Sequence, residues 1–371
     1  MKNLGFGCMR LPLLNKDDQK SIDMEQVCKM VDSFLEQGFT YFDTAYLYHE
    51  SASETAVREA LVRRHARESF QLATKMPTMI LKEEGDLEKI FSHQLEKCGV
   101  EYFDYYLMHC LNQENYELTE KFGGFEFGVR MKEEGKIRKL GFSFHDTPEL
   151  LEKILNDHPE TEFVQLQINY IDWEDANVRA HACYDICRAH NKPVIVMEPV
   201  KGGMLANVPD EAEKIFREYA PESSAASWAV RYTASLPGVF MVLSGMSDYS
   251  QLMDNTSYMK DFRPLNSEEM QIIEKVTDMI NASIAIPCTG CKYCVEGCPQ
   301  NIPVSEYFKL YNTFCQFGEK SNSRANYKGF MDNYGAASDC IACGQCEEQC
   351  PQHLPVMEYM KKVGETFDTE R

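Results

Sequence analysis

The stretch FTYFDTAYLYHES, residues 39–51, pairs a strand-sized apolar run with polar side chains that follow it directly. The run reads as a buried strand that ends at Asp43, because it is short, apolar and rich in aromatic residues. A helical pattern follows in residues 51–66, where Ser51 and Glu54 have the spacing of a capping box. A connection of this length joins parallel strands, so the stretch predicts one strand–helix unit of a parallel sheet.

The same unit recurs through the first part of the chain. Residues 21–38, for example, place apolar side chains on one helix face and end in the helix-stop residue Gly38. The predicted strands are residues 3–8, 39–44, 70–74, 102–109, 136–143, 162–169, 192–198 and 238–244. Eight units in about 280 residues match a (β/α)8 TIM barrel, an α/β fold, with a doubly wound open sheet as the alternative.

The C-terminal part carries a doubled cysteine pattern. CTGCKYCVEGCP (288–299) and CIACGQCEEQCP (340–351) both read C-x2-C-x2-C-x3-C-P. Thiolates in this pattern hold [4Fe–4S] clusters, and in two-cluster ferredoxins the fourth cysteine of each run ligates the other cluster. Zinc is the alternative, but zinc sites usually show paired C-x-x-C units. The predicted ligand sets are Cys288, Cys291, Cys294 with Cys350, and Cys340, Cys343, Cys346 with Cys298.

The repeat extends beyond the cysteines, since CPQNIPVSEYF and CPQHLPVMEYM match in register and suggest a pseudo-two-fold. Glycines at 290 and 344 would let the backbone wrap a cluster. Residues 304–318 read as a helix between the two runs. The predicted organisation is a TIM barrel over 1–266, a connecting helix over 267–284, and a small, mainly helical ferredoxin-like domain over 285–371.

Composition excludes several classes of partner. A net charge of −20, from 58 acids against 38 bases, repels nucleic acid and anionic membrane surfaces. No apolar run is long enough to span a membrane, and the N-terminus lacks the pattern of a signal peptide, so we expect a cytoplasmic protein. In a reducing compartment the remaining cysteines should be thiols. They are Cys8, Cys28, Cys98, Cys110, Cys183, Cys187 and Cys315.

Four polar side chains lie where predicted strands end. Asp43 and Tyr48 follow the second strand, Lys75 the third and His109 the fourth. Each alone is more often structural or solvated, but barrels carry their chemistry at this rim, and all four converge there. Asp43 would hold Lys75 charged, and the ammonium would lower the pKa of the Tyr48 phenol. Tyr48 could then protonate a carbonyl oxygen to which His109 donates a hydrogen bond.

The motifs FDTAYLY, ATK, LMH and GFSFHD resemble the aldo/keto reductases over roughly residues 3 to 280. The resemblance implies that Asp43, Tyr48, Lys75 and His109 form a catalytic tetrad. It also implies that a nicotinamide dinucleotide, NAD or NADP, binds across the barrel mouth without a Rossmann fold. With its cysteine-rich tail, the whole chain resembles the bacterial and archaeal branch of the superfamily that has a C-terminal ferredoxin-like domain with two [4Fe–4S] clusters.

The resemblance further implies a set of cofactor contacts after strands five to eight. Side chains there would bond the carboxamide, backbone amides the pyrophosphate, and the helix near Asp248 a phosphate. Those contacts are Ser143, Gln165, Lys201, Gly202, Gly203, Ser244, Gly245, Gln251, Asp254 and Asn255, with Asn169 a further candidate. Met197 replaces the aromatic residue that stacks on nicotinamide in many members. Gly245 and Gln251 replace the basic residues that hold the 2′-phosphate, which leaves NADH as open as NADPH.

Hydride transfer moves two electrons, whereas a cluster carries one, so the two parts of the chain raise a question of mechanism. The leading hypothesis is a nicotinamide-dependent oxidoreductase that interconverts a small carbonyl and an alcohol, with clusters that relay electrons to a redox partner protein or sense redox state. One alternative is a cluster-fed reductase that uses a flavin or direct one-electron transfer. Another is a non-enzymatic electron-transfer protein. Near the rim, Glu198 is left open as a tuning or substrate-binding acid, and Cys8 and Cys110 as either packing thiols or nucleophiles.

Overall fold

The computed structural model describes residues 2–16, 18–175, 178–288, 290, 292–350 and 353–368, apart from the side chains of 293 and 296. The described chain forms two compact units. One comprises Met1–Lys201 with Ala226–Ser267, and the other Gly202–Ala225 with Glu268–Arg371. The segment Gly202–Ala225 therefore groups with the C-terminal part, although the predicted barrel range of 1–266 includes it.

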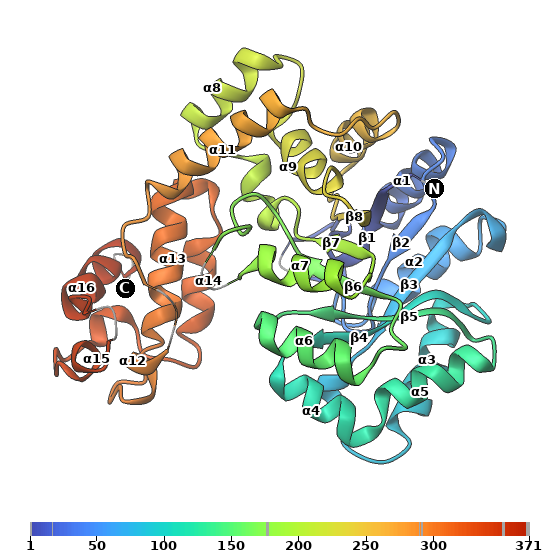
Figure 1. Ribbon diagram of the computed structural model, residues 1–371, viewed down its shortest axis with the longest axis horizontal. Coiled ribbons are helices and arrows are strands. Elements are labelled where there is room, and N and C mark those ends of the chain that lie inside the picture. The colour runs from blue at the N-terminus through green and yellow to red at the C-terminus, as the bar shows by residue number, and fades with distance from the viewer. Residues whose placement is uncertain are drawn as a thin grey trace. The chain divides into compact units, whose positions relative to one another are not determined.

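The first unit contains a closed barrel of parallel strands in the order β1 to β8, with β8 paired back to β1 (Figure 1). Closure rules out the open sheet and confirms the predicted fold class. The strands are β1 (Leu4–Gly7), β2 (Tyr41–Asp43), β3 (Gln71–Met76), β4 (Phe103–Leu111), β5 (Ile137–Phe144), β6 (Phe163–Gln167), β7 (Val194–Met197) and β8 (Val239–Ser244). Each corresponds to a predicted run.

Alternate side chains of the strands serve two different cores, as a strand period of two requires. One set, Tyr41, Ala73, Leu107, Phe163, Ile195, Met241 and Leu243, forms an apolar cluster of its own. The other set packs with the surrounding helices. Gly141 lets β5 and β6 approach closely, because a Cβ there would lie 2.5 Å from the carbonyl oxygen of Phe163. This approach places Ser143 directly opposite Gln165.

The helices of the barrel unit lie between successive strands, except α10, which follows β8. They are α1 (Met24–Glu36), α2 (Ser53–Val57), α3 (Asp86–Cys98), α4 (Gln113–Phe122), α5 (Gly124–Glu133), α6 (Pro148–Asp157), α7 (Ala180–Ala189), α9 (Ala225–Ala234) and α10 (Tyr249–Met259). The predicted capping box at Ser51 is wrong. The N-cap of α2 is Ala52, without a side-chain cap, and Ser51 has φ of 70° in the turn before it.

The second unit is helical. Its helices are α8 (Asp210–Tyr219), α11 (Ser267–Asn281), α12 (Tyr293–Glu296), α13 (Val304–Phe317), α14 (Ser323–Phe330), α15 (Gln345–Glu348) and α16 (Val356–Phe367). Its core joins α13 and α16 through Tyr307, Phe308, Met360 and Val363. Among the helices that the structure describes, none combines the length and apolarity that crossing a membrane requires.

The two cysteine runs fold alike. The short helices α12 and α15 lie against each other, and each run leads into a longer helix, α13 or α16. Left-handed backbone recurs in register, at the paired positions Gly290 and Ala342, Lys292 and Gly344, and Asn301 and His353. The predicted internal repeat is therefore present in the backbone conformation as well as in the sequence.

Candidate functional site

The barrel mouth brings the four predicted catalytic side chains together. Lys75, on β3, lies between two of them: its Nζ donates to Asp43 Oδ1 at 2.5 Å and to Tyr48 Oη at 3.2 Å. It also donates to the carbonyl oxygen of Thr44 at 2.8 Å. The rings of Tyr48 and His109 meet edge to face, with centroids 5.9 Å apart. An acid, an amine, a phenol and an imidazole thus form one continuous cluster.

Burial sets the protonation states in this cluster. Lys75 is 0% exposed, and burial lowers its pKa, but Asp43 and then Tyr48 more than compensate, so that the pKa is raised and the amine stays charged. Burial raises the pKa of Tyr48, and the opposing effect of Lys75 is smaller. The expected lowering of this pKa is therefore wrong, because burial outweighs the effect of the ammonium and the charge of Asp43 raises the pKa further. A protonated phenol at neutral pH is the form that a proton donor requires.

His109 is a neutral imidazole. Burial, followed by the charges of Lys75 and His145, lowers its pKa to about 3. Its backbone is held on both sides: Thr78 Oγ1 donates to the His109 carbonyl oxygen at 3.3 Å, and the N–H of Cys110 donates to Ser143 Oγ at 2.7 Å. A neutral ring can donate a hydrogen bond at neutral pH, but it cannot serve as the acid.

The turn after Tyr48 has an unusual backbone. His49, Glu50 and Ser51 have φ of 52°, 48° and 70°, and this is the one place in the described chain where three consecutive non-glycine residues are left-handed. Each such residue costs roughly 1–2 kcal/mol. Strain of this size persists only where surrounding contacts enforce it, and it tends to gather at functional sites.

The predicted nicotinamide contacts lie side by side on β5 and β6. Gln165 is 2% exposed, and its Oε1 is buried with no hydrogen-bond partner among the described residues. Its Nε2 lies 3.5 Å from the sulfur of Met197. A buried acceptor without a donor fits a ligand that brings its own N–H group, such as a carboxamide. The residues present therefore fit a nicotinamide at this position.

Lys201, a predicted phosphate contact, forms an ion pair with another residue of the barrel unit. Its Nζ forms an ion pair with Asp172, which is 1% exposed and also accepts from Gln167 at 2.8 Å and Asn169 at 2.7 Å. Asn169 further donates to the Glu198 carbonyl oxygen at 3.2 Å. Asp172 was not predicted, because nothing in the sequence marks which of the three acids after β6 (Asp172, Glu174 and Asp175) will be buried.

The contacts predicted after β8 also have partners in the protein. The carboxylate of Asp248 caps α10 by accepting from the N–H of Gln251 at 2.9 Å, so that helix terminus already holds an anion. Asn255 Oδ1 accepts from Tyr258 Oη at 2.6 Å and from Ser244 Oγ at 3.4 Å. Asp254 is half-buried on the same helix. These contacts within the protein shape the loop after β8.

The glycines predicted as cofactor contacts differ in their backbone and their surroundings. Gly202 and Gly203 are left-handed, with φ of 67° and 99°, and a Cβ at Gly203 would meet open space. The side chain of Arg10 packs on Gly245, since a Cβ there would lie 3.2 Å from it, and its guanidinium lies 3.8 Å from Glu198 Oε1. Arg10 therefore places a positive charge beside Gly245, a position where glycine replaces a basic residue expected from the resemblance.

The remaining cysteines of the barrel are packing thiols. Burial raises the pKa of Cys8 and of Cys110, which disfavours the thiolate that a nucleophile needs. None of the seven cysteines outside the doubled pattern, all of them in the described chain, forms a disulfide in this structure. Cys315 is exposed on α13.

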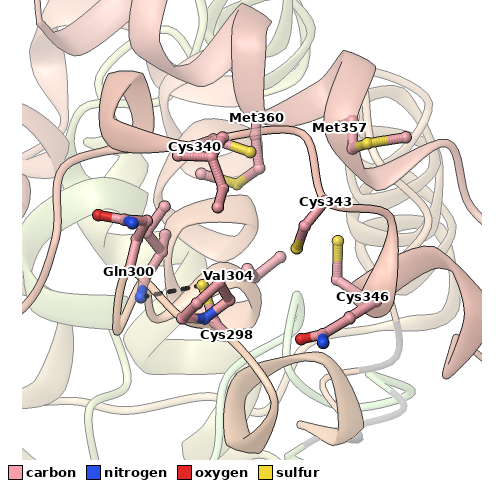
Figure 2. A pocket seen from close by; sticks show the side chains of 12 residues that line it. Cys298, Gln300, Val304, Cys340, Cys343, Cys346, Met357 and Met360 are labelled. Atoms are coloured by element: carbon pink, nitrogen blue, oxygen red, sulfur yellow. Dashed lines mark hydrogen bonds between the residues drawn. The ribbon is translucent and has the colours of Figure 1, made fainter.

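One of the two predicted cluster sites is a pocket. Cys298 from the first run and Cys340, Cys343 and Cys346 from the second line one shared pocket (Figure 2). The side chains of Cys343 and Cys346 point toward one another, with Cys298 and Cys340 on the other side of the pocket. The other lining residues are apolar or amides, including Val304, Met357 and Met360. The structure thus gathers the four cysteines that the crossed pattern predicts.

The other predicted set is described only in part. Cys291 lies outside the described residues, and Cys288, Cys294 and Cys350 are half-buried against the same helical core. Backbone amides donate to two sulfurs, from Gly290 to Cys288 and from Ile302 to Cys298, each at 3.4 Å. Successive left-handed turns aim amides inward in this way and favour an anionic centre.

A cluster fits these cysteines better than a single ion. Among the described side chains, no group of three or more His, Cys, Asp or Glu residues is placed to hold one metal ion. A tetrahedral zinc site draws its sulfurs to about 2.3 Å from one atom. An iron–sulfur cube is wider, so its four thiolates must surround an open space, and these four cysteines line one pocket.

The fold and these sites define an oxidoreductase barrel joined to an iron–sulfur domain. Residues 3–278 match the model of the aldo/keto reductase family, and residues 287–354 match that of a 4Fe-4S dicluster domain. The chain therefore belongs to the aldo/keto reductase family and carries a C-terminal 4Fe-4S dicluster domain.

Individual relatives agree with this placement. The uncharacterized oxidoreductase YqkF of Bacillus subtilis (strain 168) is 23% identical over 309 residues, 75% of this chain and 93% of that protein. The probable aldo-keto reductase 1 of Glycine max is 32% identical over 183 residues, and the match spans 47% of this chain and about half, 49%, of that protein.

Solved structures resemble the barrel. The holo form of the aldo-keto reductase AKR11C1 from Bacillus halodurans has a TM-score of 0.59 at 25% identity, covering 74% of this chain and 91% of its own. An aldo-keto reductase from Klebsiella pneumoniae in complex with NADPH has a TM-score of 0.57 at 20% identity, with 74% and 90% covered. At that identity the second likeness supports the fold alone.

Proposed function

We propose that this chain interconverts a small carbonyl compound and an alcohol, with NAD or NADP bound at the barrel mouth. The proposal is carried by the buried series Asp43–Lys75–Tyr48, in which Lys75 Nζ lies 2.5 Å from Asp43 Oδ1 and 3.2 Å from Tyr48 Oη. A bound reduced nicotinamide would supply a hydride. The residues of the chain would supply the proton and hold the substrate oxygen.

The roles follow from the protonation states. Tyr48 gives its phenolic proton to the carbonyl oxygen, and the charged Lys75 stabilises the phenolate that remains. Asp43 keeps Lys75 charged and in place. The neutral ring of His109 donates a hydrogen bond to the same oxygen and orients the substrate. In the direction of alcohol oxidation, the phenolate of Tyr48 takes the proton back.

The cofactor would be held from several strands. Gln165 Oε1 would accept from the carboxamide, next to Ser143. Gly202 and Gly203 would offer backbone amides to the pyrophosphate, and Ser244, Gly245, Gln251, Asp254 and Asn255 would line the adenosine side. Because Lys201 is paired with Asp172, we assign the phosphate-binding cation to Arg10 instead. The Klebsiella relative whose complex contains NADPH makes NADPH a cofactor to test first.

The tail would hold two [4Fe–4S] clusters. Cys340, Cys343, Cys346 and Cys298 ligate one, since they share a pocket, and Cys288, Cys291, Cys294 and Cys350 the other. Each cluster would carry one electron at a time. Its role would be to relay electrons to a redox partner protein or to report redox state.

The test is turnover by anaerobically purified protein with its iron quantified. We expect oxidation of NADPH or NADH, added separately, with 4-nitrobenzaldehyde as the probe carbonyl. Tyr48→Phe should lower kcat by about 10²- to 10⁴-fold, because proton donation is lost, while iron content and cluster absorbance stay unchanged. The matched control is Tyr46→Phe, which removes a phenol from the same loop that bonds to His93 at 3.1 Å. Equal activity of Tyr48→Phe and wild type would refute the assignment.

One observation favours a second function, a reductase fed by the clusters. Met197, and not an aromatic ring, lies beside Gln165 where nicotinamide would stack, so the site could admit a flavin or a substrate reduced by single electrons. The two functions separate on removal of the clusters by substitution of Cys298 and Cys350 with serine. Nicotinamide-dependent carbonyl reduction should survive that change, whereas cluster-fed reduction should vanish.

A further inference from the structure

A buried histidine ring connects the strained turn after Tyr48 to a distant segment of the chain. His49 is 6% exposed, and its two nitrogens reach the backbone of the segment between β1 and α1. Nε2 accepts from the N–H of Leu11 at 3.1 Å, and Nδ1 lies 3.0 Å from the carbonyl oxygen of Gln19. Because Nε2 accepts, the ring proton must sit on Nδ1 and be donated to Gln19. Both bonds exist together only in this neutral tautomer.

Two further contacts tie the same turn to the same segment. Ser53 Oγ donates to the Cys8 carbonyl oxygen at 3.2 Å, and Lys20 forms an ion pair with Glu50 at 3.2 Å. The ion pair is exposed on both sides and adds little. His49 therefore makes the buried, two-ended connection, and it does so from inside the left-handed run.

The position of the phenol depends on this turn. The backbone of Tyr48 is fixed by a bond from its N–H to Ala45 at 3.2 Å and by a bond from the N–H of Ser53 to its carbonyl oxygen at 3.2 Å, which closes the turn. If the turn relaxed to right-handed backbone, the Ser53 bond would break and the phenol would move away from Lys75. A shift of about 1 Å at a reacting group can cost on the order of 100-fold in rate.

We infer that His49 is a positioning residue for the proton donor: it holds the left-handed turn at 49–51 and thereby keeps Tyr48 within hydrogen-bond reach of Lys75. The inference rests on the proposed role of Tyr48. It goes beyond that role, because it assigns part of the catalytic geometry to the segment between β1 and α1. A merely structural clamp would affect stability without a specific effect on the chemical step.

The kinetic test compares three variants with 4-nitrobenzaldehyde and NADPH or NADH. His49→Ala should lower kcat by about 10- to 100-fold with little change in either KM, because alignment is lost and binding is not. His49→Gln keeps one donor and one acceptor and should recover most of the loss. His190→Ala is the control, since it removes a half-buried ring, bonded to Glu152 at 2.9 Å, outside the site. An unchanged kcat in His49→Ala, or a change in KM alone, would overturn the inference.

Hydrogen exchange separates this inference from the proposed function. In His49→Ala the amides of residues 44–53 should exchange faster than in wild type, whereas in His49→Gln they should not. If the wild type fails to reduce the probe, the proposed function falls, but the exchange result still decides whether His49 holds the turn. Equal exchange over 44–53 in wild type and His49→Ala would overturn the inference even if both proteins are active.

Discussion

Replacing Lys75 with methionine should destabilise the barrel strongly. The side chain is 0% exposed and donates to Asp43, Thr44 and Tyr48, and the substitution leaves a carboxylate that is 2% exposed without its cation. Breaking a buried ion pair on one side typically costs about 3–5 kcal/mol. Asp43→Asn should cost a similar amount, because it leaves the ammonium buried. The double variant should cost no more than either single one, since a neutral pair has no charge left to satisfy.

The assay is anaerobic thermal unfolding followed by near-ultraviolet circular dichroism. For a unit of about 150–250 residues, 1 kcal/mol shifts the midpoint by roughly 2–4 °C, so each single variant should unfold about 6–20 °C lower. Lys89→Met removes an exposed lysine, 3.5 Å from Asp86, and should shift the midpoint by no more than about 2 °C. A double variant that loses the sum of both single losses would refute the reasoning, because additivity means that the two groups do not interact.

Three further predictions concern the other sites. Cys298→Ser should remove the cluster held by Cys340, Cys343 and Cys346, so that the iron content of the purified protein falls by about half. The control Cys315→Ser, at an exposed cysteine outside the pattern, should keep the full iron content. Iron loss in Cys315→Ser, or full iron content in Cys298→Ser, would contradict the crossed pattern. In the folded protein the pKa of His109 is lowered to about 3 from an ordinary 6.5. As the pH falls, the imidazole of His109 is therefore protonated in the unfolded chain before it is protonated in the folded one. The free energy of unfolding should consequently decrease between about pH 6.5 and 3. His109→Gln should flatten that part of a denaturant-derived stability curve, and an unchanged curve would argue against a buried neutral ring. Ala342→Gly relieves the strain of a left-handed alanine with φ of 53° and should raise the free energy of unfolding by up to about 1 kcal/mol. The control Ala336→Gly, at a residue with φ of −68°, should not raise it. A lower free energy of unfolding in Ala342→Gly would contradict the strain.

The features that the sequence predicts well are those set by short-range patterns. A buried parallel strand must be apolar along its whole length, so all eight runs stand out, and a strand end fixes where Asp43 or Lys75 must emerge. The crossed pairing of Cys298 with the second run follows from the doubled spacing alone. Gly290 and Gly344 mark two of the left-handed positions because glycine adopts them without cost.

The features that the sequence misses depend on which polar group finds which partner. Ser51 has the spacing of a helix cap, yet it is part of a left-handed turn that distant contacts with Leu11 and Gln19 enforce. The raised pKa of Tyr48 results from a balance between burial and one shared ammonium, which spacing cannot weigh. Arg10 lies far in sequence from Gly245, and only the closed barrel brings β1 beside β8.

The division of labour between the two units follows from the number of electrons that each can handle. In the proposed barrel site, Asp43, Lys75, Tyr48 and His109 move a proton and hold an oxygen, and none of these side chains changes its oxidation state there. A hydride carries two electrons at once, a cluster accepts one, and a flavin is the usual converter between them. A chain with only these parts has no means of splitting the pair. Bleaching of the cluster absorbance by NADPH in flavin-free protein, with no added mediator, would therefore contradict this division and favour direct exchange between the two units.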